Sequence, residues 1–311
     1  MQPNISVIIP VYNRERSISM ALESLIKQSF IDFEVIIIND GSTDETASVV
    51  QNYCDKDSRM RIYSQENLGV SNARNYGISL ASGKYIAFLD SDDFYEQDFL
   101  LEMTNRIFND NSDLCYCGYY SYKDYEKKKK EKIVFHKANV LQLYLLGKLK
   151  THISCWVISK KLLIENSLSF NSSLSWGEDV EFISKCIIKA NSISYVKRHL
   201  TNYVVEEDVS KLSKFSINKI DSDYLSLMNI IDFSKQNEGK DVPEITKYRL
   251  PALITYRLNL AINKKISMDL VRGYYEKYEV HLSGFKFNNG LRSFKLLLSI
   301  MKLKLKIKGF Y

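Results

Sequence analysis

Residues 85–93 read Tyr-Ile-Ala-Phe-Leu-Asp-Ser-Asp-Asp, an apolar run that ends in a cluster of carboxylates. A short apolar run between polar residues is typical of a strand that is buried on both faces. Buried strands of this kind occur mainly in parallel sheets that are covered by helices. The acidic cluster at residues 90–93 would then lie at the carboxyl end of such a strand.

Similar runs precede it at residues 6–11 and 33–38, and a shorter one lies at 61–63. Between them, residues 17–28 and about 70–83 show the apolar spacing of helices, with Gly83 as the expected stop. This alternation predicts an α/β fold, a Rossmann-like mixed and mostly parallel sheet with helices on both faces. From about residue 215 the pattern becomes helical, which places a domain boundary near 205–215.

Three local patterns give further expectations. Ser42-Thr43-Asp44-Glu45 has the spacing of a capping box and predicts a helix from there to about residue 53. Residues 94–108 read as a helix. Lys127–Lys130 is interpreted as a solvated loop, with a contact to an anionic acceptor as the alternative.

Composition limits the function classes. The 311 residues carry a formal net charge of +6, and no nucleic-acid-binding module is recognisable. Five cysteines without paired spacing indicate a reducing cytoplasm, and four scattered histidines form no zinc-type group. Neither a signal-peptide pattern nor an apolar stretch of roughly 18–20 residues is present, so we expect a protein that is not integral to a membrane.

Polar residues follow all four predicted strands, at residues 12–14, 39–41, 65–67 and 90–93. In open parallel sheets, ligands bind outside the carboxyl ends of the strands, so these residues predict a pocket at one sheet edge. Glycine-rich phosphate loops are absent from the sequence. A bound phosphate would therefore need another source of positive charge.

The Asp90-Ser91-Asp92 motif offers such a source through a metal ion. If the strand geometry continues, Asp90 and Asp92 point the same way and form a site for Mn²⁺ or Mg²⁺, which accept one or two carboxylates together with phosphate oxygens. The alternative is a turn or the N-cap of a helix after residue 93.

The order and spacing of several blocks resemble the family 2 glycosyltransferases of the GT-A fold, of the bacterial surface-polysaccharide type. The blocks that carry the resemblance are residues 7–13, 35–44, 67–77, 85–93 and 177–179. The resemblance covers roughly residues 4–205. It implies a catalytic domain at 1–210, with a nucleotide-binding half at 1–110 and an acceptor half at 111–210, followed by a helical region at 211–311.

The resemblance also implies roles for individual residues. Those expected to bind a UDP-sugar donor are Pro10, Tyr12, Asp40, Asn67, Gly69, Arg74, Asp90, Ser91 and Asp92, with Asp92 and Asp90 at the metal. Asp179 would be the catalytic base, and Trp176 and Glu178 would line the acceptor site. Alternatives are a turn cap for Asp40, a helix acid as partner of Arg74, and a core position for Trp176. For Glu178 and Asp179 the alternative is the acidic first turn of a helix that runs through Ala190.

One part of the family pattern is missing. Many relatives carry a histidine that completes the metal site, in a segment corresponding to residues 203–210, where this chain has none. Glu206 or water could replace it, and Ser210, Lys211 and Ser213 could close over the diphosphate.

The C-terminal tail is basic, with no acidic residue after Glu279. Residues 291–301 show helical apolar spacing, whereas 302–308 alternate lysine with apolar residues at a period of two. Helix and strand both remain possible for this last stretch. Residues 291–311 predict either attachment to an anionic membrane surface, on its cytoplasmic face, or a helix packed on the rest of the protein.

Together these patterns predict an inverting, metal-assisted transferase that moves a sugar from a UDP-sugar to a hydroxyl of a carbohydrate acceptor, which could be lipid-linked. The alternatives are transfer to a polyprenyl phosphate, or a non-catalytic protein that binds nucleotide-sugars or acts as a scaffold.

Overall fold

A computed structural model of the chain describes residues 3–123, 127–205, 216–286 and 290–309. Contacts between residues divide the chain into two compact units. The first comprises Met1–Ser173 and Glu178–Asp208, and the second comprises Leu174–Gly177 and Val209–Tyr311. The short segment Leu174–Gly177 thus belongs to the C-terminal unit, which the sequence pattern does not indicate. The predicted domain limits stay a prediction.

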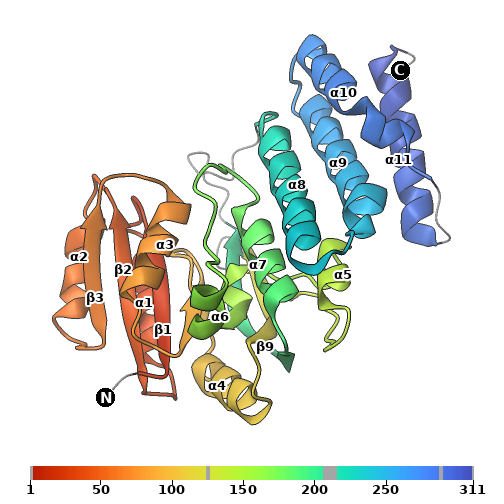
Figure 1. The fold of residues 1–311 in the computed structure, drawn as a ribbon. Helices are drawn as coiled ribbons and strands as arrows, with labels where there is room; N and C mark the ends of the chain where they lie inside the picture. The colour runs from red at the N-terminus through yellow and green to blue at the C-terminus, as the bar shows by residue number, and fades with distance from the viewer. Residues whose placement is uncertain (1–2, 124–126, 206–215, 287–289, 310–311) are drawn as a thin grey trace. The chain divides into compact units, whose positions relative to one another are not determined.

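A nine-stranded sheet runs through the first unit (Figure 1). Its strands are β1 (Ile5–Val11), β2 (Phe33–Asp40), β3 (Met60–Gln65), β4 (Tyr85–Phe88), β5 (Phe94–Tyr95), β6 (Leu114–Lys123), β7 (Lys127–Lys130), β8 (Trp156–Ser159) and β9 (Ile193–Val205). The order is β3-β2-β1-β4-β8-β6-β9-β5, and β7 pairs with β6. Strands β3, β2, β1 and β4 are parallel, whereas β8 runs antiparallel between β4 and β6. The predicted α/β class with a mixed sheet is confirmed.

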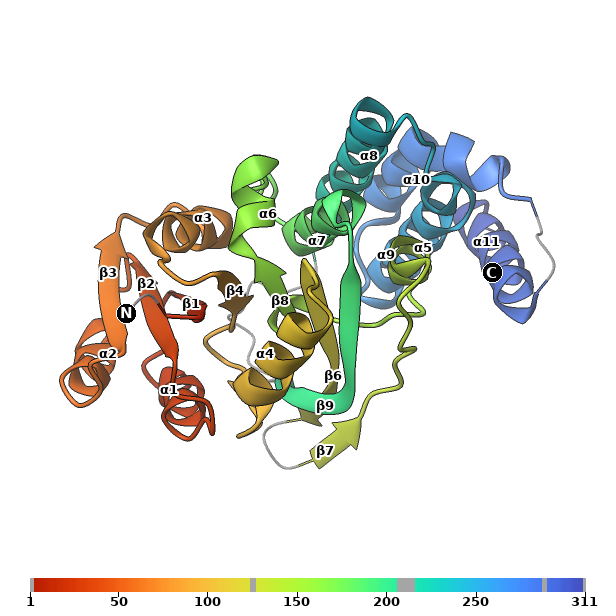
Figure 2. The ribbon, with the colours of Figure 1, turned by 60° about the horizontal axis from the view of Figure 1, so that its bottom comes forward.

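Helices cover both faces of the parallel strands. The first unit contains α1 (Ile18–Ile26), α2 (Thr46–Cys54), α3 (Val70–Leu80), α4 (Phe99–Asn109), α5 (Val140–Leu145), α6 (Lys160–Glu165) and α7 (Glu178–Lys189), with a short 3-10 turn at Ile153–Cys155. Figure 2 shows α3 on one face of β1–β3, and α1 and α2 on the other. All residues of β1 are buried, as expected for a strand between two helical layers.

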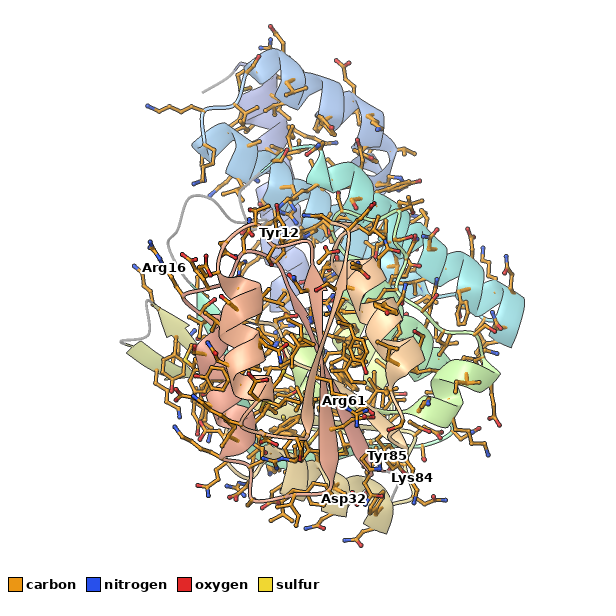
Figure 3. The ribbon with its side chains drawn as sticks, turned by 90° about the vertical axis from the view of Figure 1, so that its left-hand side faces the viewer. Tyr12, Arg16, Asp32, Arg61, Lys84 and Tyr85 are labelled. Carbon is orange, nitrogen blue, oxygen red and sulfur yellow. The ribbon has the colours of Figure 1, made fainter. Side chains whose placement is uncertain are left out.

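The polar residues that follow the parallel strands lie at one end of the sheet. Figure 3 shows Tyr12 and Arg16, which follow β1, at one end, and Asp32, Lys84 and Tyr85 at the other. The polar residues that follow β1, β2, β3 and β4 therefore gather at the carboxyl edge, as the sequence predicts.

Two predicted helix starts are wrong. Helix α2 begins at Thr46 rather than at the expected capping box, because the Ser42 hydroxyl instead accepts a hydrogen bond from the backbone of Asn13. Helix α4 begins at Phe99 rather than at residue 94, because Phe94 and Tyr95 form β5 and pair with β9. In both cases a contact between distant segments overrides the local pattern.

Gly83 does not end a helix either. Helix α3 stops at Leu80, and the following Ala81 is extended. A Cβ atom on Gly83 would lie 2.6 Å from the backbone nitrogen of Ser6, so glycine is needed there for close approach to β1.

Lys127–Lys130 is a strand and not the loop that the sequence suggests, since β7 pairs antiparallel with the end of β6. An edge strand that carries lysines resists pairing with further chains. Here Lys128 forms an ion pair of 2.8 Å with Glu96.

The second unit is helical. It contains α8 (Lys219–Glu238), a π-helical turn η2 (Ile245–Arg249), α9 (Leu250–Asn263), α10 (Met268–Ser283) and α11 (Leu291–Ile307). Helix α9 packs against α8, α10 and α11. The alternating stretch at residues 302–308 is thus helical through Ile307, and the strand interpretation is wrong. Among the residues described, none of the helices is long and apolar enough to span a membrane.

Candidate active site at the carboxyl edge of the sheet

The loops after β1 and β2 are bonded to each other. The Asn13 side chain accepts a hydrogen bond from the Thr43 backbone (2.8 Å), and Arg14 donates its backbone N–H to the Thr46 hydroxyl (2.7 Å). Asn13 adopts a left-handed conformation, with φ of 49°, which asparagine tolerates better than most residues. The neighbouring Tyr12 is 43% exposed, so its ring is available to a ligand at this edge.

Asp40 holds the loop that leads into α3. One carboxylate oxygen accepts hydrogen bonds from the Gln65 side chain (2.7 Å) and the Leu68 backbone (2.9 Å), and the other accepts from the Gly69 backbone (2.9 Å). Asp40 does not cap the turn that follows it, because that role falls to Asn39, whose side chain accepts from Ser42. Asp40 and Gly69, which are both predicted to bind the sugar donor, are thus in direct contact.

Gly41 explains how this loop comes so close to β2. Its φ is 74°, and a Cβ atom there would lie 2.8 Å from the Asn67 nitrogen. Asn67 and Gly69 are both exposed, whereas Pro10 is buried in β1.

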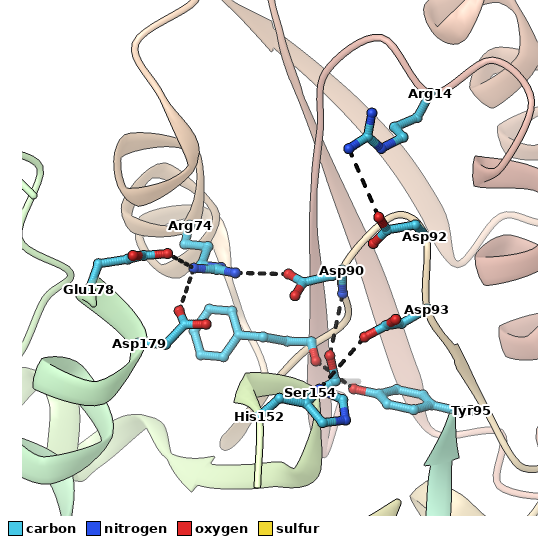
Figure 4. A network of polar contacts seen from close by, with 11 residues as sticks. Arg14, Arg74, Asp90, Asp92, Asp93, Tyr95, His152, Ser154, Glu178 and Asp179 are labelled. Carbon is cyan, nitrogen blue, oxygen red and sulfur yellow. Dashed lines mark hydrogen bonds and ion pairs between the residues drawn. The ribbon is translucent and has the colours of Figure 1, made fainter. Parts of the chain in front are cut away.

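Arg74 joins three predicted site residues (Figure 4). Its side chain is 3% exposed and contacts Asp90 (2.8 Å), Asp179 (2.6 Å) and Glu178 (3.4 Å). The guanidinium also lies 5.1 Å from the centre of the Phe170 ring. Arginine suits this position because its planar fork presents several donors to different carboxylates at once.

The charge balance around Asp179 places its pKa near neutrality. Burial raises the pKa of this carboxyl most strongly, the Arg74 cation lowers it, and the neighbouring Glu178 and Asp90 raise it again, to about 7. Asp179 lies in the first turn of α7, where the helix dipole favours an anion. A carboxylate with a pKa near the working pH is suited to general-base catalysis.

Residues 90–93 form a turn and not a continued strand, because the Asp93 N–H donates to the carbonyl of Asp90 (3.0 Å). The expectation that Asp90 and Asp92 point the same way through strand alternation is therefore wrong. Asp90 faces Arg74, whereas Asp92 lies 3.9 Å from Arg14 (Figure 4). The alternative of a turn is confirmed, whereas that of a helix cap is wrong, since α4 begins only at Phe99.

The turn is fixed to the rest of the unit through Asp93, which lies next to His152, a contact that sequence patterns do not reveal. Asp93 is 1% exposed, accepts a hydrogen bond from the Val204 backbone (3.0 Å) and lies 3.6 Å from the ring nitrogen of His152. Burial raises the pKa of the Asp93 carboxyl, and the neighbouring His152 opposes this rise. A lone histidine in the sequence gives no signal for such a contact, which depends on the fold.

The acidic residues fit a divalent ion only in part. Within the described ranges, no group of three or more histidine, cysteine, aspartate or glutamate side chains is arranged to hold a metal. Asp92 alone nevertheless matches a pattern that Mg²⁺ accepts, in which one carboxylate is completed by phosphate oxygens and water. Glu206, Ser210, Lys211 and Ser213 lie outside the described residues.

Trp176 belongs to the second unit. There the ammonium of Lys219 lies 3.9 Å and the guanidinium of Arg257 lies 5.3 Å from the centre of its ring. Arg257 also pairs with Asp223 at 2.9 Å. Trp176 is partly exposed in a cationic setting, which differs from the apolar core position considered as its alternative.

Comparison with known proteins gives the family. The model of "Glycosyl transferase family 2" matches residues 6–166, more than half of the chain. The chain belongs to this family. The sequence resemblance is thereby confirmed, and the four strand ends described above lie within the matched residues.

Individual relatives agree with this assignment. The glycosyltransferase GlyA of Streptococcus pneumoniae is 30% identical over 214 residues, which cover 65% of this chain but only 31% of GlyA. Among solved structures, TarS 1–349 of S. aureus in complex with UDP-GlcNAc has a TM-score of 0.75 at 21% identity, covering 98% of this chain and 88% of that one. A mannosyltransferase of Pyrobaculum calidifontis in complex with GDP-Man and Mn²⁺ has a TM-score of 0.57 at 18% identity, covering 100% and 83%. These likenesses confirm the predicted GT-A fold with C-terminal helices.

Replacing His152 with glutamine should lower the free energy of unfolding by about 1–3 kcal/mol, because the buried Asp93 carboxyl loses the imidazole beside it and keeps the Val204 N–H. Urea titration measures the effect. The matched control is the double-mutant cycle with Asp93→Asn, in which the two losses should be less than additive. A coupling free energy of zero would show that the two side chains do not interact.

Proposed function

We propose that the protein is an inverting glycosyltransferase that uses a nucleotide-sugar donor and Asp179 as its general base. One observation carries the proposal: Arg74 contacts both Asp90 at the end of β4 and Asp179 at the start of α7. The acidic turn and the base candidate thus share one buried cation. Membership of the family supports transferase activity.

The donor is proposed to be a UDP-sugar, bound at the carboxyl edge by Pro10, Tyr12, Asp40, Asn67 and Gly69. The exposed Tyr12 ring offers a stacking surface for the base. Three of the hydrogen-bonding positions of the Asp40 carboxylate are filled by the chain, and a carboxylate has about four. The position that remains suits the N–H of a uracil ring. The UDP-GlcNAc complex of TarS, which shares the fold, agrees with this choice.

Mn²⁺ or Mg²⁺ is proposed to be held chiefly by Asp92, next to Ser91, since Asp90 is turned toward Arg74. When bound, the ion would supply the positive charge that neutralises the leaving diphosphate. Arg14, close to Asp92, adds a fixed cation at the same turn. The Mn²⁺ and GDP-Man complex of the Pyrobaculum calidifontis mannosyltransferase is consistent with a metal in this fold.

Asp179 is proposed to take the proton of the acceptor hydroxyl while its oxygen attacks the anomeric carbon. The new carbon–oxygen bond forms as the bond to the diphosphate breaks on the opposite face, so the configuration inverts. Arg74 keeps the base candidate partly ionised near neutral pH, because the cation lowers the pKa of Asp179. Glu178 is proposed to contact a carbohydrate acceptor, free or lipid-linked, whereas the acceptor role of Trp176 stays a prediction.

Addition of a UDP-sugar with Mn²⁺ should raise the melting temperature, because a ligand that binds only the folded state stabilises it. A panel of UDP- and GDP-sugars, with and without EDTA, measures the specificity. Asp92→Asn should remove the metal-dependent part of the shift. If no nucleotide-sugar changes the melting temperature, the proposed donor site is wrong.

Asp179→Asn should reduce the rate of sugar transfer by about 10²–10⁴-fold, because the amide cannot accept the proton. Its melting-temperature shift with the donor should match that of the unchanged protein. Asp55→Asn, the same chemical change at an exposed position after α2, is the control and should leave the rate unaltered. Full transfer activity in Asp179→Asn would contradict the assignment of the base.

The rate at low substrate concentration, kcat/KM, should rise with pH up to about 7 and then level off. The base works only when deprotonated, and the pKa of Asp179 is about 7. In Arg74→Gln the inflection should move to higher pH, because the cation that lowers this pKa is gone. An inflection that stays in place would show that another group controls the profile.

A further inference from the structure

Helix α11 carries two separate apolar stripes. The first consists of Leu296, Ile300, Leu303 and Ile307, which are buried against the other helices of the second unit. The second, named here the outer stripe, consists of Leu291, Phe294, Leu298, Met301 and Leu305, each between 40% and 71% exposed. The first stripe supplies the buried contacts of α11 with the other helices of the unit.

The outer stripe is continuous. Its members are spaced by three, four, three and four residues, so with about 3.6 residues per turn they lie along one side of the helix, roughly opposite the buried stripe. At about 1.5 Å per residue the stripe extends for about 21 Å. A row of this length is more than the scattered exposed apolar residues of an ordinary surface.

Basic residues border the outer stripe on both sides. Lys295, Lys302 and Lys306 each follow a stripe residue and so lie on one border, about 60–100° from its centre, and Lys304 and Lys308 lie on the other. With Arg292, residues 291–308 carry six basic and no acidic side chains. The rest of the chain is balanced, with 37 acidic residues against the same number of basic ones, so this segment carries the entire net charge of +6.

This charge pattern distinguishes two partners that could cover the outer stripe, a second copy of α11 and an anionic bilayer. A second copy of α11 would place lysines of one chain against lysines of the other at the borders of the seam, where paired helices normally place opposite charges. The surface of an anionic bilayer meets both features, because acyl chains accept the apolar stripe and phosphate groups attract its basic borders.

We propose that α11 docks the protein on an anionic phospholipid surface, with the outer stripe in the headgroup–acyl boundary and the bordering lysines at the phosphates. The helix would lie in the plane of the surface, since its opposite face packs within the second unit. This inference does not depend on the donor or the base proposed above.

Flotation of the full chain with vesicles tests the proposal. We expect binding to vesicles with 30% phosphatidylglycerol, at least tenfold weaker binding to pure phosphatidylcholine, and loss of binding in high salt, because screening weakens the lysine contacts. Leu298→Ser/Met301→Ser/Leu305→Ser should weaken binding to the anionic vesicles at least tenfold. Lys295→Gln/Lys302→Gln/Lys306→Gln should do so as well.

The control is Leu225→Ser/Leu270→Ser/Val280→Ser, which removes three exposed apolar side chains from α8 and α10 of the same unit and should bind as before. Circular dichroism and melting temperature show that each variant is folded. Equal binding by the stripe variant and the control would overturn the proposal. So would concentration-dependent dimers, measured by sedimentation, that only the stripe variant abolishes.

Discussion

A buried guanidinium holds the candidate site together. Arg74 is almost fully enclosed, and a charge in such a place is tolerated only when acidic partners surround it. Its partners come from two distant segments, the turn at residue 90 and the first turn of α7. The same contact therefore sets the position of α3, the acidic turn and α7 relative to one another. Removing the cation would leave three carboxylates facing each other.

The position of Arg74 depends in turn on how closely α3 approaches the sheet. Gly77 lies one turn further along the helix, and a side chain there would collide with Ile8 of β1. Glycine at this position brings the helix close to the strand, and Arg74 then reaches the sheet edge at which β4 ends. Packing inside the first unit thus determines the electrostatics of the site, and the protonation of Asp179 follows from both.

Much of this could be predicted from the sequence, because buried strands and amphipathic helices have local patterns. The four parallel strands, α1, α3 and α7 lie close to where those patterns place them. The errors arose where partners distant in sequence decide the outcome. Phe94 and Tyr95 join β9 instead of starting a helix, and Ser42 bonds to Asn13 instead of capping α2. The alternating lysines of α11 are helical because Leu303 and Ile307 continue its buried stripe.

The candidate site divides in the same way. Asp40, Arg74, Asp90, Asp92 and Asp179 could be named from family blocks, but the links between them could not, since Arg74 is 105 residues from Asp179 along the chain. The Asp93–His152 pair has no sequence signature, because any aspartate and any histidine can be brought together by a fold.

The loops after β1 and β2 are hydrogen-bonded to each other at the edge where the ligand is expected. Because each loop already restrains the other, a ligand that binds at this edge loses little free energy to ordering the protein, and most of the contact energy remains available as affinity.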